Sequence, residues 1–159
     1  MSTVAPHSAA RTLLSVPSDP NRVGHDWLGT LAEVPLFEGL SKRHLRRIAK
    51  LARIRRFADG SAMVRAGDVG RTFYVLLDGN AKVNRPGRRS VRLGRGAFFG
   101  EMALIDDSPR SADVIAEGEV LALTIDRPGF TKLLRAEPTL SQRLLRTLAA
   151  RLRAAEATD

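Results

Sequence analysis

The chain has 159 residues, and 43% of them are hydrophobic, which suits one globular domain with a single core. Its formal net charge is +9, an excess that permits contact with nucleic acid, membrane surfaces or acidic partners. The chain has no cysteine, which excludes disulfides, thiolate metal sites and thiol catalysis. It also has no apolar run long enough to predict a membrane span.

Residues 1–25 are rich in Ser, Pro, Ala and Thr and show no periodicity, which predicts a mobile arm ahead of a domain over residues 26–159. A first helix is expected to begin near Asp26. A second helix is expected to begin at Ser41, with an apolar face formed by Leu45, Ile48, Ala49 and Ala52.

The stretch from Gly39 to Ala58 is strongly basic, with eight Lys or Arg residues and no acid. A solvated helix face is the simplest interpretation of such a charge run. The alternative is a nucleic-acid surface, to which Arg85, Arg88 and Arg89 of the NRPGRRS segment would add.

Residues 61–125 change to a β pattern. Short runs rich in Val, Leu, Ile and Phe, at 61–68, 71–83, 90–99 and 111–125, alternate with glycine turns, which predicts a small β-barrel or sandwich. Asp78-Gly79 and Glu117-Gly118 are predicted to form tight hairpins, because glycine adopts a positive φ without strain.

Helical periodicity returns over 127–138 and 139–156. The second of these segments carries a leucine stripe, Leu140, Leu144, Leu148 and Leu152, at intervals of four residues. A stripe with this spacing is typical of a packing or dimer seam.

The segment GAFFGEMALIDDSPRSADV, residues 96–114, combines groups suited to a phosphorylated ligand. Gly100 precedes EMALI, an expected helical turn whose first amides attract anions. Arg110 can meet two phosphate oxygens with its planar fork, and Ser111 adds a hydroxyl. Glu101 only accepts hydrogen bonds, so it suits a sugar hydroxyl. These groups predict a site for a nucleotide with one compact phosphate.

The stretch FGEMALIDDSPRSADV resembles the phosphate-binding cassette of cyclic-nucleotide-binding domains, a family of catabolite-activator regulators, cyclic-nucleotide-dependent kinases and gated channels. The resemblance covers roughly residues 27–153 and includes PLFEGLS, AGDVGRTFYVLLDGNAKV and LALTIDRPGFTKLL. It implies an α+β fold, mainly an antiparallel, jelly-roll-like β-roll with flanking N-terminal and C-terminal helices and a short helix in the cassette.

The resemblance also implies a role for particular residues. Glu101 would accept the ribose 2′-hydroxyl, Arg110 would pair with the cyclic phosphate, and Ser111 would bond a phosphate oxygen. Backbone amides near Gly100 and Ala103 would complete the cradle. The other candidate ligand contacts are Met102, Ala112 and Phe99 in or beside the cassette, and Val83, Val91 and Leu93 on the base-pocket strands. The last helix resembles a mobile lid, with Leu144, Arg146 and Leu148 as candidate contacts.

The expected ligand is cAMP, with cGMP as the second candidate. A threonine just after the cassette arginine often accompanies cGMP preference in eukaryotic members of the family, and this chain has Ser111, as in bacterial cAMP-responsive regulators. We expect no further cofactor and no metal, because the three histidines, at positions 7, 25 and 44, are scattered.

Each cassette residue also has a purely structural interpretation. Arg110 could pair with Asp106 or Asp107, Glu101 could complement a helix N-terminus, and Ser111 could be an ordinary strand residue. No nucleophile–base pair accompanies these residues, so we expect no catalysis.

Three functions therefore compete. The first is a cytoplasmic cyclic-nucleotide sensor that repositions its C-terminal helices on ligand binding and acts through a protein partner or a homodimer. The second is a nucleic-acid-binding transcription regulator or a fragment of one, although the chain lacks a groove-reading motif. The third is a degenerate β-roll that serves only in assembly.

Overall fold

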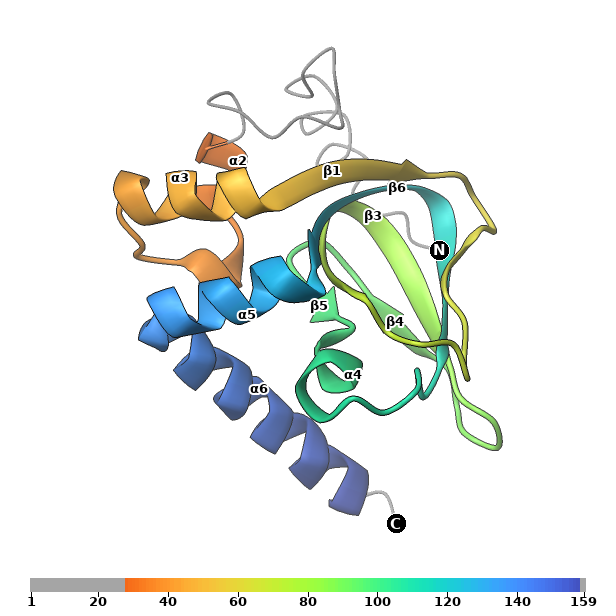
Figure 1. Cartoon of the computed structure of the whole chain (residues 1–159). Coiled ribbons are helices and arrows are strands. Elements are labelled where there is room, and N and C mark those ends of the chain that lie inside the picture. The colour runs from red at the N-terminus through yellow and green to blue at the C-terminus, as the bar shows by residue number, and fades with distance from the viewer. Residues whose placement is uncertain (1–27, 158–159) are drawn as a thin grey trace.

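The computed structural model describes residues 28–157, except for the side chain of Ala103. The predicted mobile arm over 1–25 lies outside the described residues. Two long strands, β3 (Thr72–Asn84) and β6 (Asp113–Asp126), form the centre of a curved roll. Figure 1 shows most helices gathered at one side of this roll and a short helix, α4 (Glu101–Asp106), close to its lower opening. The α+β class and the antiparallel roll predicted from the sequence are confirmed.

All strand pairs are antiparallel, in the order β1-β6-β3-β4. The outer strands of this path are β1 (Ala52–Phe57) and β4 (Val91–Leu93). The shorter β2 (Ala62–Val64) pairs with β6, and β5 (Phe98–Phe99) pairs with β3. Because β5 pairs with β3, it holds the start of the cassette helix α4, which follows at Glu101, beside the central strands.

The hairpins predicted at Asp78-Gly79 and Glu117-Gly118 are wrong, because both dipeptides lie inside continuous strands. The register of β3 with β6 shifts on either side of Asp78, as in a bulge. Gly79 does adopt a positive φ of 90°, and a Cβ at this position would lie 2.5 Å from the carbonyl oxygen of Glu119. The lack of a side chain at Gly79 therefore allows β3 to lie close to the main chain of β6 at Glu119.

The N-terminal helices are α2 (Leu28–Ala32), a 3-10 turn η2 (Pro35–Phe37) and α3 (Lys42–Leu51). Ser41 caps α3, since its hydroxyl accepts from the His44 amide at 3.3 Å. The predicted helix was expected to include Ala52, but Ala52 is the first residue of β1, a strand that the sequence pattern did not predict.

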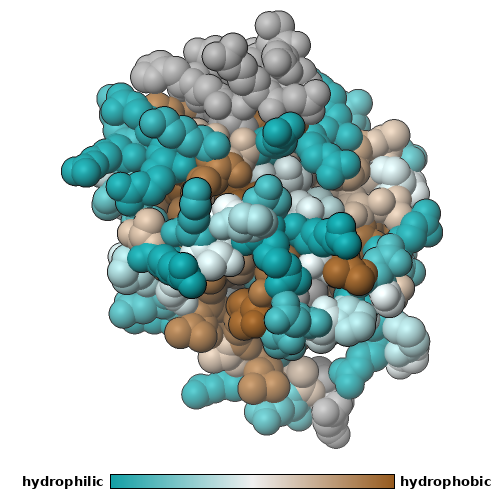
Figure 2. All heavy atoms as spheres, in the orientation of Figure 1, coloured by the Kyte–Doolittle hydropathy of each residue, from teal (hydrophilic) through white to brown (hydrophobic). Residues whose placement is uncertain are grey.

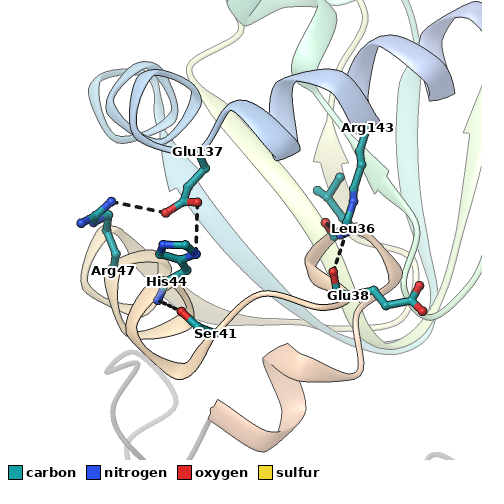
Figure 3. Close-up of polar contacts among 7 residues, drawn as sticks. All are labelled: Leu36, Glu38, Ser41, His44, Arg47, Glu137 and Arg143. Atoms are coloured by element: carbon teal, nitrogen blue, oxygen red, sulfur yellow. Dashed lines mark hydrogen bonds and ion pairs between the residues drawn. The ribbon is translucent and has the colours of Figure 1, made fainter.

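The C-terminal helices are α5 (Arg127–Ala136), capped by Asp126, and α6 (Pro138–Ala157). Glu137 lies between them, and its buried carboxylate contacts Arg47 at 3.3 Å and His44 at 3.5 Å (Figure 3). The joint between α5 and α6 is therefore tied to α3 by charge as well as by packing.

The described core has two clusters. The larger joins the helices to one face of the sheet, and Leu140 and Leu144 of the leucine stripe belong to it. The second lies within the roll and includes Tyr74, Phe99 and Val114. Figure 2 shows hydrophilic residues over much of the α3 region and hydrophobic spheres in the lower part, where Figure 1 places α4 and α6.

Candidate functional site

Gly100 connects β5 to α4 in a conformation that other residues rarely adopt, with φ +93°. A Cβ on Gly100 would lie 2.7 Å from the Thr72 carbonyl oxygen and 2.9 Å from a guanidinium nitrogen of Arg110. The absence of a side chain thus allows the cassette backbone to lie directly against β3 and against Arg110.

The Arg110 guanidinium is fixed by main-chain carbonyls. Its two terminal nitrogens donate to the Gly100 oxygen at 2.9 Å and to the Thr72 oxygen at 2.6 Å, and its carbon lies 6.0 Å from the centre of the Tyr74 ring. Main-chain bonds between Arg110 and residues 67 and 68, at 2.8 Å, hold its backbone in the fold. The Arg110 side chain is therefore held in place by the fold itself.

No ion pair with Arg110 is found among residues 28–157. Asp107, one of its expected structural partners, pairs with Arg127, and Asp106 accepts hydrogen bonds from Ser108. Arg110 is 9% exposed. Burial lowers the pKa of this guanidinium, whereas Tyr74 and Glu101 raise it. A buried cation bonded only to carbonyls keeps its full charge for an anion.

Glu101 begins α4 and is 2% exposed. Its carboxylate accepts from Arg151 of α6, at 3.4 Å and 3.2 Å from the two oxygens. The other terminal nitrogen of Arg151 donates to the Phe98 carbonyl at 2.8 Å, and the guanidinium lies 4.8 Å from the Phe98 ring centre. One arginine thus joins the last helix to both ends of the β5–α4 junction.

Arg151 was not predicted from the sequence. It lies seven residues after Leu144 on α6, and residues at this spacing share a helix face. An arginine on the apolar face of an amphipathic helix indicates a buried polar partner, and this pattern could have identified Arg151.

The remaining predicted contacts surround the cassette unevenly. Val83 and Val91 are opposite each other in the β3–β4 pair, two positions from the pair formed by Ala81 and Leu93. Val83 and Leu93 are half-buried against the inner cluster, and Val91 is exposed. These side chains form one face of the β3–β4 ladder.

Within the cassette itself, Phe99 and Ala112 are buried, while Met102 and Ser111 are exposed. Phe99 stacks on Tyr74, with ring centres 4.7 Å apart. Ala103 lies in α4, and its side chain falls outside the described part.

The three lid candidates lie in different environments. Leu144 is buried in the main core, Leu148 is half-buried, and Arg146 is exposed and lines a groove beside η2. The hydrogen bonds from α6 to the cassette described above are made by Arg151, which is not one of the three candidates.

The basic residues considered for nucleic acid do not form one surface. Arg46 and Lys50 are exposed on α3, and Arg85, Arg88 and Arg89 are exposed in the β3–β4 hairpin. Figure 1 places α3 and this hairpin at opposite ends of the molecule. Arg47 is partly neutralised by Glu137.

The described part of the chain holds no group of three or more His, Asp or Glu side chains arranged for a metal ion. None of its helices combines the length and the apolar character needed to cross a bilayer.

The fold and site define a β-roll with a buried arginine and a buried carboxylate in one short cassette. The sequence profile of the cyclic nucleotide-binding domain matches residues 54–137, which include this whole cassette. The chain belongs to the cyclic nucleotide-binding domain family. The resemblance noted from the sequence is confirmed.

Several relatives share this region. The chain is 38% identical over 108 residues to a cAMP-dependent protein kinase regulatory subunit of Mucor circinelloides, covering 65% of this chain and 25% of that protein. It is 37% identical over 117 residues to a cyclic nucleotide-gated potassium channel of Rhizobium etli, covering 74% and 33%. The chain thus spans only a quarter to a third of these relatives.

A solved structure agrees with this assignment. The Thermus thermophilus catabolite activator protein superposes with a TM-score of 0.71 at 30% identity, covering 78% of this chain and 61% of that one. The comparisons favour the cyclic-nucleotide interpretation over the nucleic-acid and assembly alternatives.

Proposed function

We propose that this chain is a regulatory module that binds a cyclic nucleotide, with cAMP as the preferred ligand, and that it is not an enzyme. The observation that carries the proposal is Arg110, a buried guanidinium held beside Gly100 with carbonyl partners instead of a carboxylate. Removing a charge from water is costly, so a buried cation of this kind favours an anionic ligand.

The cyclic phosphate would accept hydrogen bonds from those Arg110 N–H groups that do not already donate to Gly100 and Thr72. A nearby hydroxyl donor is available on exposed Ser111. Glu101 would accept a hydrogen bond from the ribose 2′-hydroxyl, while Arg151 orients the carboxylate. The serine after the cassette arginine is the basis for preferring cAMP over cGMP.

Arg151 also provides a route from the ligand to α6. A ribose bound at Glu101 would share the carboxylate that Arg151 contacts. If α6 can occupy more than one position against the cassette, ligand binding would then stabilise one of these positions. Such a shift can be no larger than the difference in ligand affinity between the two positions. We propose that the position of α6 is sensed by a protein partner, of the kind that a kinase regulatory subunit binds, or by a second copy of the chain. We place this interaction in the cytoplasm.

The test is calorimetric titration of the chain with cAMP and with cGMP, repeated on Arg110→Ala. We expect saturable cAMP binding that the substitution weakens at least about tenfold, because a charge-assisted hydrogen bond is lost. Arg135→Ala, an exposed arginine on α5, is the matched control and should retain the original affinity. Equal affinity of the wild type and Arg110→Ala would exclude the phosphate role.

A further inference from the structure

Arg151, which pairs with Glu101, also lines a groove. This groove of about 500 Å³ runs between α6 and the segments around η2 and β5, and it is lined by Arg143, Arg146, Arg151, Pro35, Leu36 and Phe98, among others. Its volume is in the range of small-molecule sites. Of the residues considered above for the nucleotide, the lid candidate Arg146 lines this groove, whereas Gly100, Glu101, Arg110 and Ser111 of the cassette do not.

The groove carries a positive charge that its surroundings do not balance. Arg143 donates to two carbonyls, those of Leu36 at 2.7 Å and Glu38 at 2.6 Å, which leaves its charge uncompensated (Figure 3). Arg146 is exposed and forms no ion pair within residues 28–157. Arg151 has one carboxylate partner, Glu101.

Glu38 is the acid that lines the groove. Figure 3 shows its carboxylate directed away from the Arg143 guanidinium, which contacts only the Glu38 main chain. Three arginines and one acid therefore line the groove, and Glu101 outside it pairs with one of the three, Arg151.

Two of the arginines are also held in place. The bonds from Arg143 to Leu36 and Glu38 fix it against η2, and the bonds from Arg151 to Glu101 and Phe98 fix it against the cassette. Side chains that are ordered before binding lose little entropy when a ligand arrives. Between them, Pro35, Leu36 and Phe98 supply apolar surface.

We propose that this groove binds a small organic phosphate. The phosphate would bond Arg146, with Arg143 and Arg151 on either side, because planar guanidinium groups match phosphate oxygens in pairs. The apolar part of the ligand would lie against Leu36 and Phe98. This site is separate from the one proposed for the cyclic nucleotide.

The groove and the cassette share Arg151, so the two ligands should affect each other. A phosphate in the groove draws Arg151 away from Glu101 and leaves that buried carboxylate less well paired, which should weaken cyclic-nucleotide binding. Coupling between two sites is reciprocal, so cAMP should weaken phosphate binding by the same factor. This coupling rests on the proposed function, whereas phosphate binding itself does not.

The test is a titration with phenyl phosphate, followed by backbone amide NMR shifts. Benzyl alcohol is the uncharged control. We expect saturable shifts at Phe98 and Thr147 with phenyl phosphate alone, and a loss of affinity of at least about fivefold in Arg146→Ala. The matched control is Arg153→Ala, an exposed arginine on the same helix outside the groove, which should change the affinity less than about twofold.

The proposal is overturned if no saturable shift occurs up to about 10 mM phenyl phosphate. It is equally overturned if Arg146→Ala and Arg153→Ala weaken binding to the same extent, since that indicates general charge attraction. Phenyl phosphate binding without any cAMP binding would reject the proposed function and leave the groove intact. If both ligands bind with no mutual effect, the sharing of Arg151 is refuted.

Discussion

Arg151→Ala is expected to release the last turns of α6 from the cassette. The substitution removes the pair with Glu101, the hydrogen bond to the Phe98 carbonyl and the contact with the Phe98 ring. It leaves a carboxylate that is 3% exposed without its arginine.

The cost can be bracketed from the exposure of the two partners. A pair buried on both sides costs about 3–5 kcal/mol when one partner is removed, and an exposed pair contributes about 0.2–1 kcal/mol. The Arg151 side chain is 40% exposed, so solvent screens it and reduces the buried value. We therefore expect a loss of about 2 kcal/mol, including the ring contact.

Urea unfolding measures this loss, and amide hydrogen exchange locates it. Exchange should accelerate over residues 148–157, because the hydrogen bonds of Arg151 tie this part of α6 to the cassette. Arg153→Ala is the control, since it makes the same change two residues further along the helix. A double-mutant cycle with Glu101→Gln isolates the pair energy.

Equal destabilisation of the chain by Arg151→Ala and by Arg153→Ala would contradict this prediction. A coupling energy of about zero between Arg151 and Glu101 would also refute it.

Two further predictions concern the glycine and a buried acid. Gly100→Ala should destabilise the chain by about 1 kcal/mol or more beyond the effect of Gly87→Ala, and it should also weaken cAMP binding. Gly87→Ala is the control because both glycines have a positive φ, but a Cβ at Gly87 would meet no atom within 4 Å. Thermal unfolding with calorimetry checks this, and equal effects at the two sites would contradict it. Burial raises the pKa of Asp78, so the wild type should lose stability as pH rises from the unfolded value through the folded one. Asp78→Asn should lack that loss, so its stability relative to the wild type should grow over this interval in urea titrations; a pH-independent difference would contradict the assignment.

Local sequence patterns predicted the cassette well because its chemistry is local. Gly100, Glu101 and Arg110 lie within eleven residues, and the glycine and the helical turn have the expected conformations. The ladder that places Val83 opposite Val91 also follows from a short hairpin. Their roles toward a ligand remain predictions.

The parts that were missed depend on long-range contacts. The strand β1 contains three arginines and continues directly from α3, so its charge hides the alternation of buried Ala52 and Ile54. Asp78-Gly79 has the composition of a turn, but pairing with β6 keeps it within a strand. Arg151 meets Glu101 across fifty residues, a contact that no local pattern specifies.

A crystal structure of the chain grown with saturating cAMP is the decisive experiment for the proposed nucleotide site. We expect the cyclic phosphate within hydrogen-bond distance of the Arg110 guanidinium and the ribose 2′-hydroxyl hydrogen-bonded to Glu101. Nucleotide bound elsewhere, or a cassette that stays empty at millimolar cAMP with Arg110 still on its two carbonyls, would contradict it.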